Sequence, residues 1–249
     1  MKSKFKIVFA IVAVFLLTTG VAFSATIDLT GTIRDFNDTH PDFEMSPYTA
    51  QTGMVAQTLG SDGKPVYIAG STTADNFNQW YNSVSGVNMT DNLTISLDNG
   101  ITSDPNIYTF TDSSFFPIDG ELFGNQGRSH NYHFTFELHS NFTYQGGETF
   151  AFTGDDDLWV FINNQLAIDL GGVHGAQSAS VNLDGLGLTA GNDYDFDLFF
   201  AERHTVASTF RIDTSIALTP SIPTVPEPAT FILLGSGLAG LALYRRKRK

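Results

Sequence analysis

The sequence predicts an all-β protein, an antiparallel β-sandwich with one short helix. Three observations favour this fold class. Apolar residues alternate with period two along much of the chain, turn-forming Gly, Asn and Asp separate the alternating segments, and helical spacing is convincing at one place only. The chain of 249 residues is long enough to bury its own core, and without cysteine it must be stabilised by that core and by any bound metal.

The alternating segments give the expected strands in chain order. Residues at i and i+2 of a strand share one face, so each alternating segment can bury one side. Asn163 and Asn164 predict a tight turn between two strands, because Asn tolerates positive φ. A helix is expected over 73–85, where Phe77, Trp80 and Tyr81 recur at helical spacing. The strands are expected at 27–29, 93–97, 132–138, 150–152, 158–162, 166–170, 194–200 and 210–214.

The N-terminal segment, residues 1–24, predicts a secretory signal peptide. Three lysines precede an apolar run over 7–17, and the small residues Ala22 and Ser24 lie before a cleavage site. A membrane anchor or a buried helix is the alternative, but the apolar run is short for a membrane span. The working domain is therefore expected to be exported and to cover residues 25–218.

The C-terminal segment predicts a membrane-associated sorting signal. Residues 219–228 form a proline-rich linker, and 229–249 combine an apolar stretch with five terminal basic residues. This pattern predicts a transmembrane helix whose basic tail stays in the cytoplasm. Together with Val225, Pro226, Glu227 and Pro228, it resembles the PEP-CTERM sorting signal. The resemblance implies a precursor in the inner membrane, processing by an exosortase, and delivery to the outer surface or matrix of an exopolysaccharide producer. A plain tail anchor is the alternative.

The charge of the working domain excludes one class of partner. The whole chain has a net charge of −13, and residues 25–225 carry 25 acidic against five basic side chains. Nucleic-acid binding needs Lys and Arg to neutralise phosphates, so nucleic acid is not an expected partner. An acidic domain favours divalent cations instead.

Asp155, Asp156 and Asp157 form the densest charge cluster and immediately precede the most apolar strand. Adjacent carboxylates repel one another, and a hard cation such as Ca²⁺ relieves the repulsion with oxygen ligands. Neighbouring side chains of an ordinary strand point to opposite faces, so two adjacent Asp need an unusual backbone, such as a cis peptide, to hold one ion. A solvated acidic loop or a helix cap is the alternative.

His174, Glu202 and His204 follow neighbouring expected strands and could meet the Asp cluster at one end of the sandwich. A mixed site of His and carboxylate would suit zinc better than calcium. Glu202 could instead pair with Arg203, or form an acid/base couple with Asp156 in a hydrolase. None of the common catalytic motifs occurs in the sequence, which weighs against the common enzyme classes.

Ordered blocks across the working domain resemble the fibro-slime domain family. This family is related to the lectin-like sandwich module of anthrax protective antigen. In its calcium-dependent sugar-binding relatives, two consecutive Asp joined by a cis peptide hold Ca²⁺, which helps to bind sugar hydroxyls. The resemblance implies that this pair is Asp155 and Asp156, with Asn163 at a position where those relatives carry Asp or Asn. The blocks are 31–36, 40–44, 77–81, 116–120, 131–135, 152–174, 200–204 and 210–212.

These expectations predict an exported, non-catalytic surface or matrix protein that binds carbohydrate or matrix polymer with calcium. The metal ligands would come from Asp155, Asp156 and Asp157, and His174, Glu202, His204 and Asn163 are candidates for further ligands or sugar contacts. A structural matrix protein without a discrete ligand is the second hypothesis. A glycan-active hydrolase is the third.

Overall fold

A computed structural model describes residues 24–44 and 49–220. The expected signal peptide up to residue 23, the linker beyond residue 220 and the expected C-terminal transmembrane helix lie outside these described residues. Within the described ranges, no helix combines the length and the apolar character that a membrane span requires.

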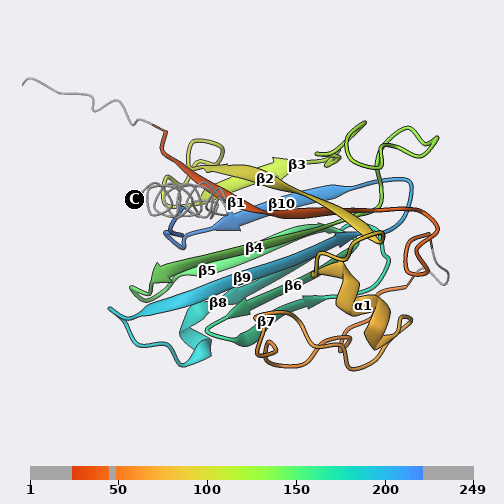
Figure 1. Ribbon diagram of the computed structural model, residues 1–249. Coiled ribbons are helices and arrows are strands. Elements are labelled where there is room, and N and C mark those ends of the chain that lie inside the picture. Colours follow the sequence, from red (N-terminus) through yellow and green to blue (C-terminus); the bar gives the residue numbers. More distant parts are fainter. Residues whose placement is uncertain (1–23, 45–48, 221–249) are drawn as a thin grey trace, which may run out of the picture.

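The described residues form an all-β fold with one short α-helix, α1 (Ala74–Trp80), and one 3₁₀ turn, η1 (Leu183–Leu186) (Figure 1). Every strand pairing is antiparallel, and the strand order is β7-β6-β9-β4-β1-β2-β3-β10-β5-β8. The strands are β1 (Thr26–Phe36), β2 (Asn88–Asp98), β3 (Tyr108–Asp112), β4 (Phe134–Thr143), β5 (Thr149–Asp155), β6 (Asp157–Ile162), β7 (Gln165–Leu170), β8 (Gln177–Asn182), β9 (Asp193–Glu202) and β10 (Thr209–Thr214).

The sheet folds over itself, so that its two halves pack face to face. A single residue pair, Asp98 with Thr109, joins β2 to β3 and links the halves. The Phe200 ring of β9 lies 5.1 Å from Phe210 of β10 and 6.2 Å from Phe152 of β5. The outermost strands, β7 and β8, also contact each other. The all-β prediction is therefore confirmed, in an antiparallel sheet with a shape between a sandwich and a barrel.

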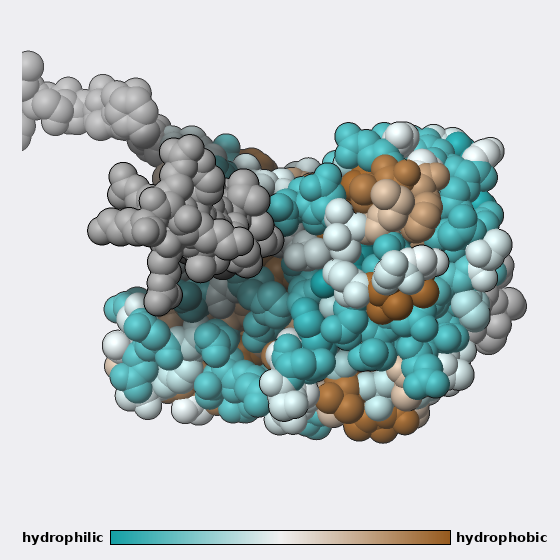
Figure 2. Space-filling model, in the orientation of Figure 1, coloured by the Kyte–Doolittle hydropathy of each residue, from teal (hydrophilic) through white to brown (hydrophobic). Residues whose placement is uncertain are grey.

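A second apolar cluster covers the outer face of β6 and β9. Trp159 of β6 packs against Phe77 and Trp80 of α1, with ring centroids 5.6 and 6.3 Å apart. Both faces of β6 are thereby covered, which explains why its sequence is apolar at successive positions rather than alternating. Outside these clusters the surface is mostly hydrophilic, with separate hydrophobic patches (Figure 2). Among described residues, the exposed large hydrophobic side chains are Val66, Ile68, Met89, Ile101 and Val206.

Helix α1 is shorter than the segment 73–85 predicted from the sequence. It begins as expected, because the Thr73 side chain caps it by accepting a hydrogen bond from the Asn76 N–H at 3.2 Å. It ends at Trp80, since the side-chain amide of Asn82 donates to the Asn78 carbonyl at 2.8 Å. That carbonyl would otherwise accept the backbone N–H of residue 82 in a continuing helix.

The strands give the domain two distinct ends. β5 ends and β10 begins at one end, where Asp155 pairs with Thr209, and the pairing of Asp157 with Ala201 places the start of β6 and the end of β9 there too. β10 runs from this end to Thr214 at the other, where it pairs with Phe150 of β5. We call Asp155, Asp156 and Glu202, at the first end, the acidic rim.

Asp35 of β1 is a buried carboxyl that makes stability depend on pH. Burial raises its pKa from 3.8 to about 6, against the opposing effects of Asn131 and of the Phe123 N–H, which donates to Asp35 Oδ2 at 2.7 Å. The folded protein therefore keeps a proton that the unfolded chain releases near pH 4. We expect the Asp35 contribution to stability to be complete below about pH 4 and to be lost as the pH rises through about 6.

Replacing Asp35 with Asn should remove this contribution while keeping an oxygen for Phe123 to bond. The measurement is the urea midpoint of the parent and of Asp35→Asn between pH 4 and 7, taken as a difference so that other titrating groups cancel. A difference that stays constant across this range would contradict the prediction.

Candidate functional site

Asp155 and Asp156 lie side by side at the acidic rim, at the break between β5 and β6. The peptide bond between them is cis, as the resemblance implied for a calcium-holding pair. Asp155 Oδ1 accepts the backbone N–H of Thr209 at 2.5 Å. Asp156 accepts two further backbone N–H groups, from His174 at 3.1 Å and from Arg203 at 3.0 Å. The loop after β7, the loop after β9 and the start of β10 are therefore fastened to these two carboxylates.

Asp157 has a different environment from the other two carboxylates. Its Oδ1 accepts the backbone N–H of Gly172 at 2.5 Å, and its Oδ2 accepts from Arg203 Nε at 2.6 Å. Both side chains of this ion pair have 0% exposure. Of the three Asp from which metal ligands are predicted, Asp157 is thus paired with the Arg203 guanidinium. The suggested pairing of Arg203 with Glu202 is replaced by this pairing with Asp157.

Glu202, the last residue of β9, is fully buried next to the Asp pair. Its Oε1 accepts the backbone N–H of His204 at 3.3 Å, whereas its Oε2 has no hydrogen-bond partner among the described residues. The Ser208 hydroxyl lies close enough to moderate the pKa of Glu202, but its geometry falls short of a hydrogen bond. A buried carboxylate oxygen without a partner is energetically unfavourable, so a cation or a proton bound to this atom would stabilise the folded protein.

The electrostatics of the acidic rim favour a neutral or metal-bound form. Burial, together with the charge of Asp157, raises the pKa of Asp156 to about 8. Burial raises the pKa of Asp155 too, and that of Glu202 rises well above its usual value through burial and the charges of Asp156 and Asp155. Crowded, buried carboxylates bind either protons or a cation. Since all the atoms concerned are oxygens, the donor set fits a hard ion such as Ca²⁺.

A cavity of about 290 Å³ opens directly over the Asp pair. His174 and His204 lie on its walls, so the structure brings both predicted histidines to the rim. Each ring already has a neighbour: His174 Nδ1 lies 2.9 Å from the Gly175 carbonyl, and His204 Nε2 lies 3.1 Å from Glu44 Oε2. Val206, 83% exposed, contributes an apolar edge. The cavity is lined by Asp155, Asp156, Val173, His174, Gly175, His204, Thr205, Val206 and Ala207.

Asn163 lies away from this cavity. It occupies the turn between β6 and β7 with φ of 51°, as the turn prediction required. β6 runs from Asp157 to Ile162, so the turn lies about 20 Å from the start of the strand. The expectation that Asn163 joins the site is wrong, because the strand separates it from the acidic rim.

Glu44 is a site neighbour that the sequence did not reveal. Its carboxylate contacts His133 at 2.9 Å, His204 at 3.1 Å and Arg128 at 3.5 Å, which ties the segment between β1 and α1 to the loop after β9. An isolated Glu in a region without periodicity carries no signal for this role. Among residues 24–44 and 49–220, no three His, Cys, Asp or Glu side chains converge closely enough to form a metal centre by themselves.

Two family models match parts of the chain. The family model of the PA14 domain matches residues 107–228, which contain β3 to β10 and the acidic rim. The model of the PEP-CTERM protein-sorting motif matches residues 224–249, so the predicted sorting motif is found. This motif indicates export and sorting to the cell envelope.

Particular proteins are similar to larger parts of the chain. Protein psiQ of Dictyostelium discoideum is 45% identical over an alignment of 196 residues, and the match covers 72% of this chain and 20% of psiQ. Protein psiC of the same organism is 40% identical over an alignment of 217 residues, and the match covers 78% of this chain and 42% of psiC. The chain therefore spans less than half the length of these curated relatives.

Solved structures with a PA14 domain are similar at low identity. The PA14 sugar-binding domain from RTX adhesin is 12% identical, covers 76% of this chain and 90% of its own, and has a TM-score of 0.35. The PA14 domain of MpAFP antifreeze protein is also 12% identical, with coverage of 50% and 71% and a TM-score of 0.30.

Proposed function

We propose that this protein is a non-enzymatic carbohydrate-binding module of the cell envelope, in which Ca²⁺ held at Asp155 and Asp156 binds sugar hydroxyls. The single observation that carries the proposal is the arrangement of the acidic rim: two adjacent buried carboxylates beneath an open cavity, with the partnerless oxygen of Glu202 beside them. The PA14 match over the same residues supports a lectin-like module. The narrower assignment to the fibro-slime family stays a prediction.

The oxygen atoms of the rim suit an ion that is bound by the two carboxylates and by sugar hydroxyls together. Ca²⁺ takes six to eight oxygen ligands, and two carboxylates leave room for sugar hydroxyls. When bound, the ion would supply positive charge that balances the rim carboxylates and attracts hydroxyl oxygens. His174 and His204 on the cavity walls would contact the sugar, and the exposed Val206 side chain would pack on its apolar C–H face.

We expect Ca²⁺ to raise the melting temperature of residues 25–220, and Asp156→Asn to abolish that rise. Binding stabilises the folded state by RT ln(1 + [L]/Kd), about 2.7 kcal/mol at a hundredfold excess over Kd. Asn keeps one oxygen, which can accept the N–H of His174 or of Arg203 but not both. The variant therefore removes the charge and one of these hydrogen bonds, and its own melt in EDTA is the reference for its calcium response. Thermal melts with CaCl₂ and with EDTA provide the measurement.

Asp195→Asn, at an exposed position of β9, is the matched control and should keep the full calcium response. A glycan array probed with the parent protein in calcium and in EDTA then tests sugar binding. Melting curves that coincide with and without calcium in the parent would remove the metal from the proposal, and calcium-dependent melting without any glycan signal would remove the sugar.

A structural matrix protein is the second candidate, and one observation favours it. The Asp155 and Asp156 oxygens already accept three backbone N–H groups, from the loop after β7, the loop after β9 and the first residue of β10, so the carboxylates also organise the rim without an ion. Under this alternative, calcium would change the stability of the folded protein but would not make it bind sugar. In either case we propose that an exosortase recognises the Val225–Pro228 motif of a precursor held in the inner membrane.

A further inference from the structure

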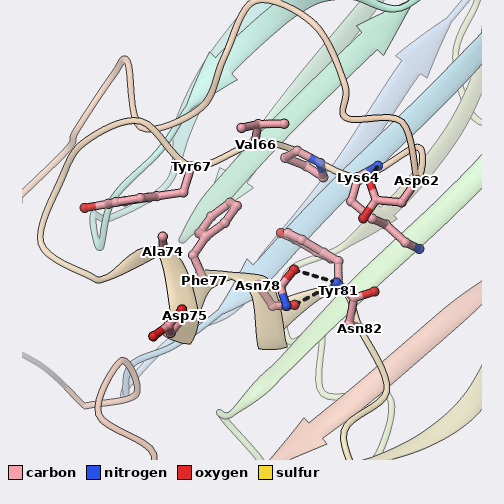
Figure 3. Close-up of a pocket in the computed structure, with 11 residues that line it drawn as sticks. Asp62, Lys64, Val66, Tyr67, Ala74, Asp75, Phe77, Asn78, Tyr81 and Asn82 are labelled. Atoms are coloured by element: carbon pink, nitrogen blue, oxygen red, sulfur yellow. Dashed lines mark hydrogen bonds between the residues drawn. The ribbon is translucent and has the colours of Figure 1, made fainter.

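A second cavity lies on the outer face of the domain, between α1 and the loop that precedes it. Its volume is about 320 Å³, and it shares no lining residue with the cavity over the acidic rim. Figure 3 shows the rings of Tyr67, Phe77 and Tyr81 on its walls, with the polar side chains of Asp75 and Asn78 along the helix. Aromatic walls with a few polar groups are typical of small-molecule sites.

Tyr81 supplies the strongest sign of a ligand. Its side chain is 1% exposed, and its ring packs edge-on against Phe199 of β9 at 5.0 Å. The hydroxyl has no hydrogen-bond partner among the described residues, although the residue lines the cavity. In Figure 3 the hydroxyl points toward the space between Phe77 and Val66. A buried hydroxyl without a partner is unfavourable, and a ligand hydroxyl in the cavity would satisfy it.

The helix edge offers further groups for a polyhydroxylated ligand. The Asn82 amide nitrogen donates to the Asn78 carbonyl at 2.8 Å and to Asn78 Oδ1 at 3.0 Å. This arrangement fixes both amides and leaves Asn82 Oδ1 as an acceptor and Asn78 Nδ2 as a donor beside the exposed Asp75 carboxylate. Acceptors and donors at short spacing match the vicinal hydroxyls of a sugar ring.

The charge of the cavity selects among sugars. Asp62 and Asp75 are both on the lining, and the ammonium of Lys64 is engaged by Glu137 of β4. An anionic sugar would therefore meet repulsion. A neutral ring meets none, and its C–H face can pack on the aromatic walls.

We infer that this cavity binds one neutral pyranose unit of a polysaccharide chain without calcium. The inference rests on the proposed carbohydrate-binding function and adds a second contact point to it. Tyr81 donates its hydroxyl hydrogen to a sugar oxygen, Asn78 and Asp75 bind the outer hydroxyls, and Tyr67 and Phe77 contact the ring.

Both tryptophans of the protein report on this cavity. Trp80 and Trp159 are the only two in the sequence, and their rings lie 4.9 and 5.6 Å from Phe77 on the cavity wall. Titration of residues 25–220 in EDTA with cellohexaose and with maltohexaose, followed by intrinsic fluorescence, measures binding there. We expect a saturable change with at least one neutral probe and none with oligogalacturonate.

Tyr81→Phe is the sharpest variant, because it removes only the hydroxyl. We expect about three- to tenfold weaker binding with an unchanged or higher melting temperature, since no bond in the protein is lost. Asn78→Ala, at an exposed helix position, should also weaken binding. Tyr144→Phe is the control: it removes a hydroxyl bonded to Asp184 at 2.6 Å elsewhere, and should leave binding unchanged.

The outcomes separate this inference from the calcium proposal. No fluorescence change with either neutral probe in EDTA, or a preference for oligogalacturonate, would overturn the second site and leave calcium-dependent binding at the rim untouched. Binding that Tyr81→Phe leaves at full strength would overturn it too. Chelator-resistant binding that Tyr81→Phe weakens would support it even if the rim binds no metal.

Discussion

Replacing Arg203 with Met is expected to destabilise the domain by about 3–5 kcal/mol, because Asp157 would remain buried as an uncompensated charge. Arg203 Nε bonds Asp157 Oδ2 at 2.6 Å, and both side chains have no solvent exposure. The guanidinium also lies 4.6 Å from the centroid of the Trp80 ring, so its loss weakens the contact with α1 as well. Urea denaturation of the parent and the variant measures the loss.

A surface ion pair gives the matched comparison. Arg211 and Asp213 of β10 form a pair of the same length, 2.6 Å, but with 38% and 28% exposure. Arg211→Met should cost no more than about 1 kcal/mol. The double variant Asp157→Asn with Arg203→Met should recover part of the loss, since it removes both charges. Equal effects of Arg203→Met and Arg211→Met would show that burial does not control the strength of the Asp157 pair.

Phe200→Ala is the second change with a large expected effect, a loss of about 3–5 kcal/mol. Phe200 is fully buried at the contact between the two halves of the sheet. Its ring lies within 6.2 Å of four other phenylalanine rings, which are those of Phe115, Phe134, Phe152 and Phe210. Alanine would leave a cavity between halves that are joined by one residue pair at β2 and β3. The free energy of unfolding from urea titration provides the test.

Phe116→Ala serves as its control. Phe116 is half-buried and stacks on the exposed ring of His130 at 4.0 Å, outside the core between the halves. Its loss should cost about 1 kcal/mol, since little apolar surface leaves the core. A Phe200→Ala variant as stable as Phe116→Ala would mean that the two halves do not depend on this contact.

The sequence predicts those strands that carry a clear hydrophobic pattern, either alternating or continuous. The alternation at 194–200 falls within β9 and the apolar run at 158–162 within β6. Two strands escaped prediction for a physical reason. β8 alternates between half-buried and exposed positions with small, polar side chains, and β3 buries only Thr109 fully. Each strand has only two apolar residues at alternate positions, Tyr108 and Phe110 in β3 and Ala179 and Val181 in β8, and so short a pattern does not identify a strand. Helix α1 ended early because a side-chain bond from Asn82 competes with the backbone, which composition does not reveal.

Only those parts of the candidate site that are close together in the sequence could be predicted. Asp155 and Asp156 could be singled out because they are adjacent in sequence and precede an apolar strand. The separate environment of Asp157 depends on Arg203, 46 residues away, and the contact of Glu44 with His204 depends on residues 160 positions apart. Spacing along the chain carries no information about such long-range contacts. Asn163 was misplaced because the length of β6 had not been taken into account.

The direction of the strands determines where the acidic rim lies relative to the point at which the chain leaves the domain toward the sorting motif. β1 starts and β10 ends at the end of the domain opposite the acidic rim. Asp35, near the end of β1, pairs with Phe134 of β4, which in turn pairs with Glu202 of the rim. β10 begins at the rim and runs away from it to Thr214. The chain then continues from Thr219, whose N–H donates to the Asn141 carbonyl at 2.8 Å, toward the sorting motif at 224–249. The acidic rim and the residue from which the chain leaves the domain toward the sorting motif therefore lie at opposite ends of the described residues.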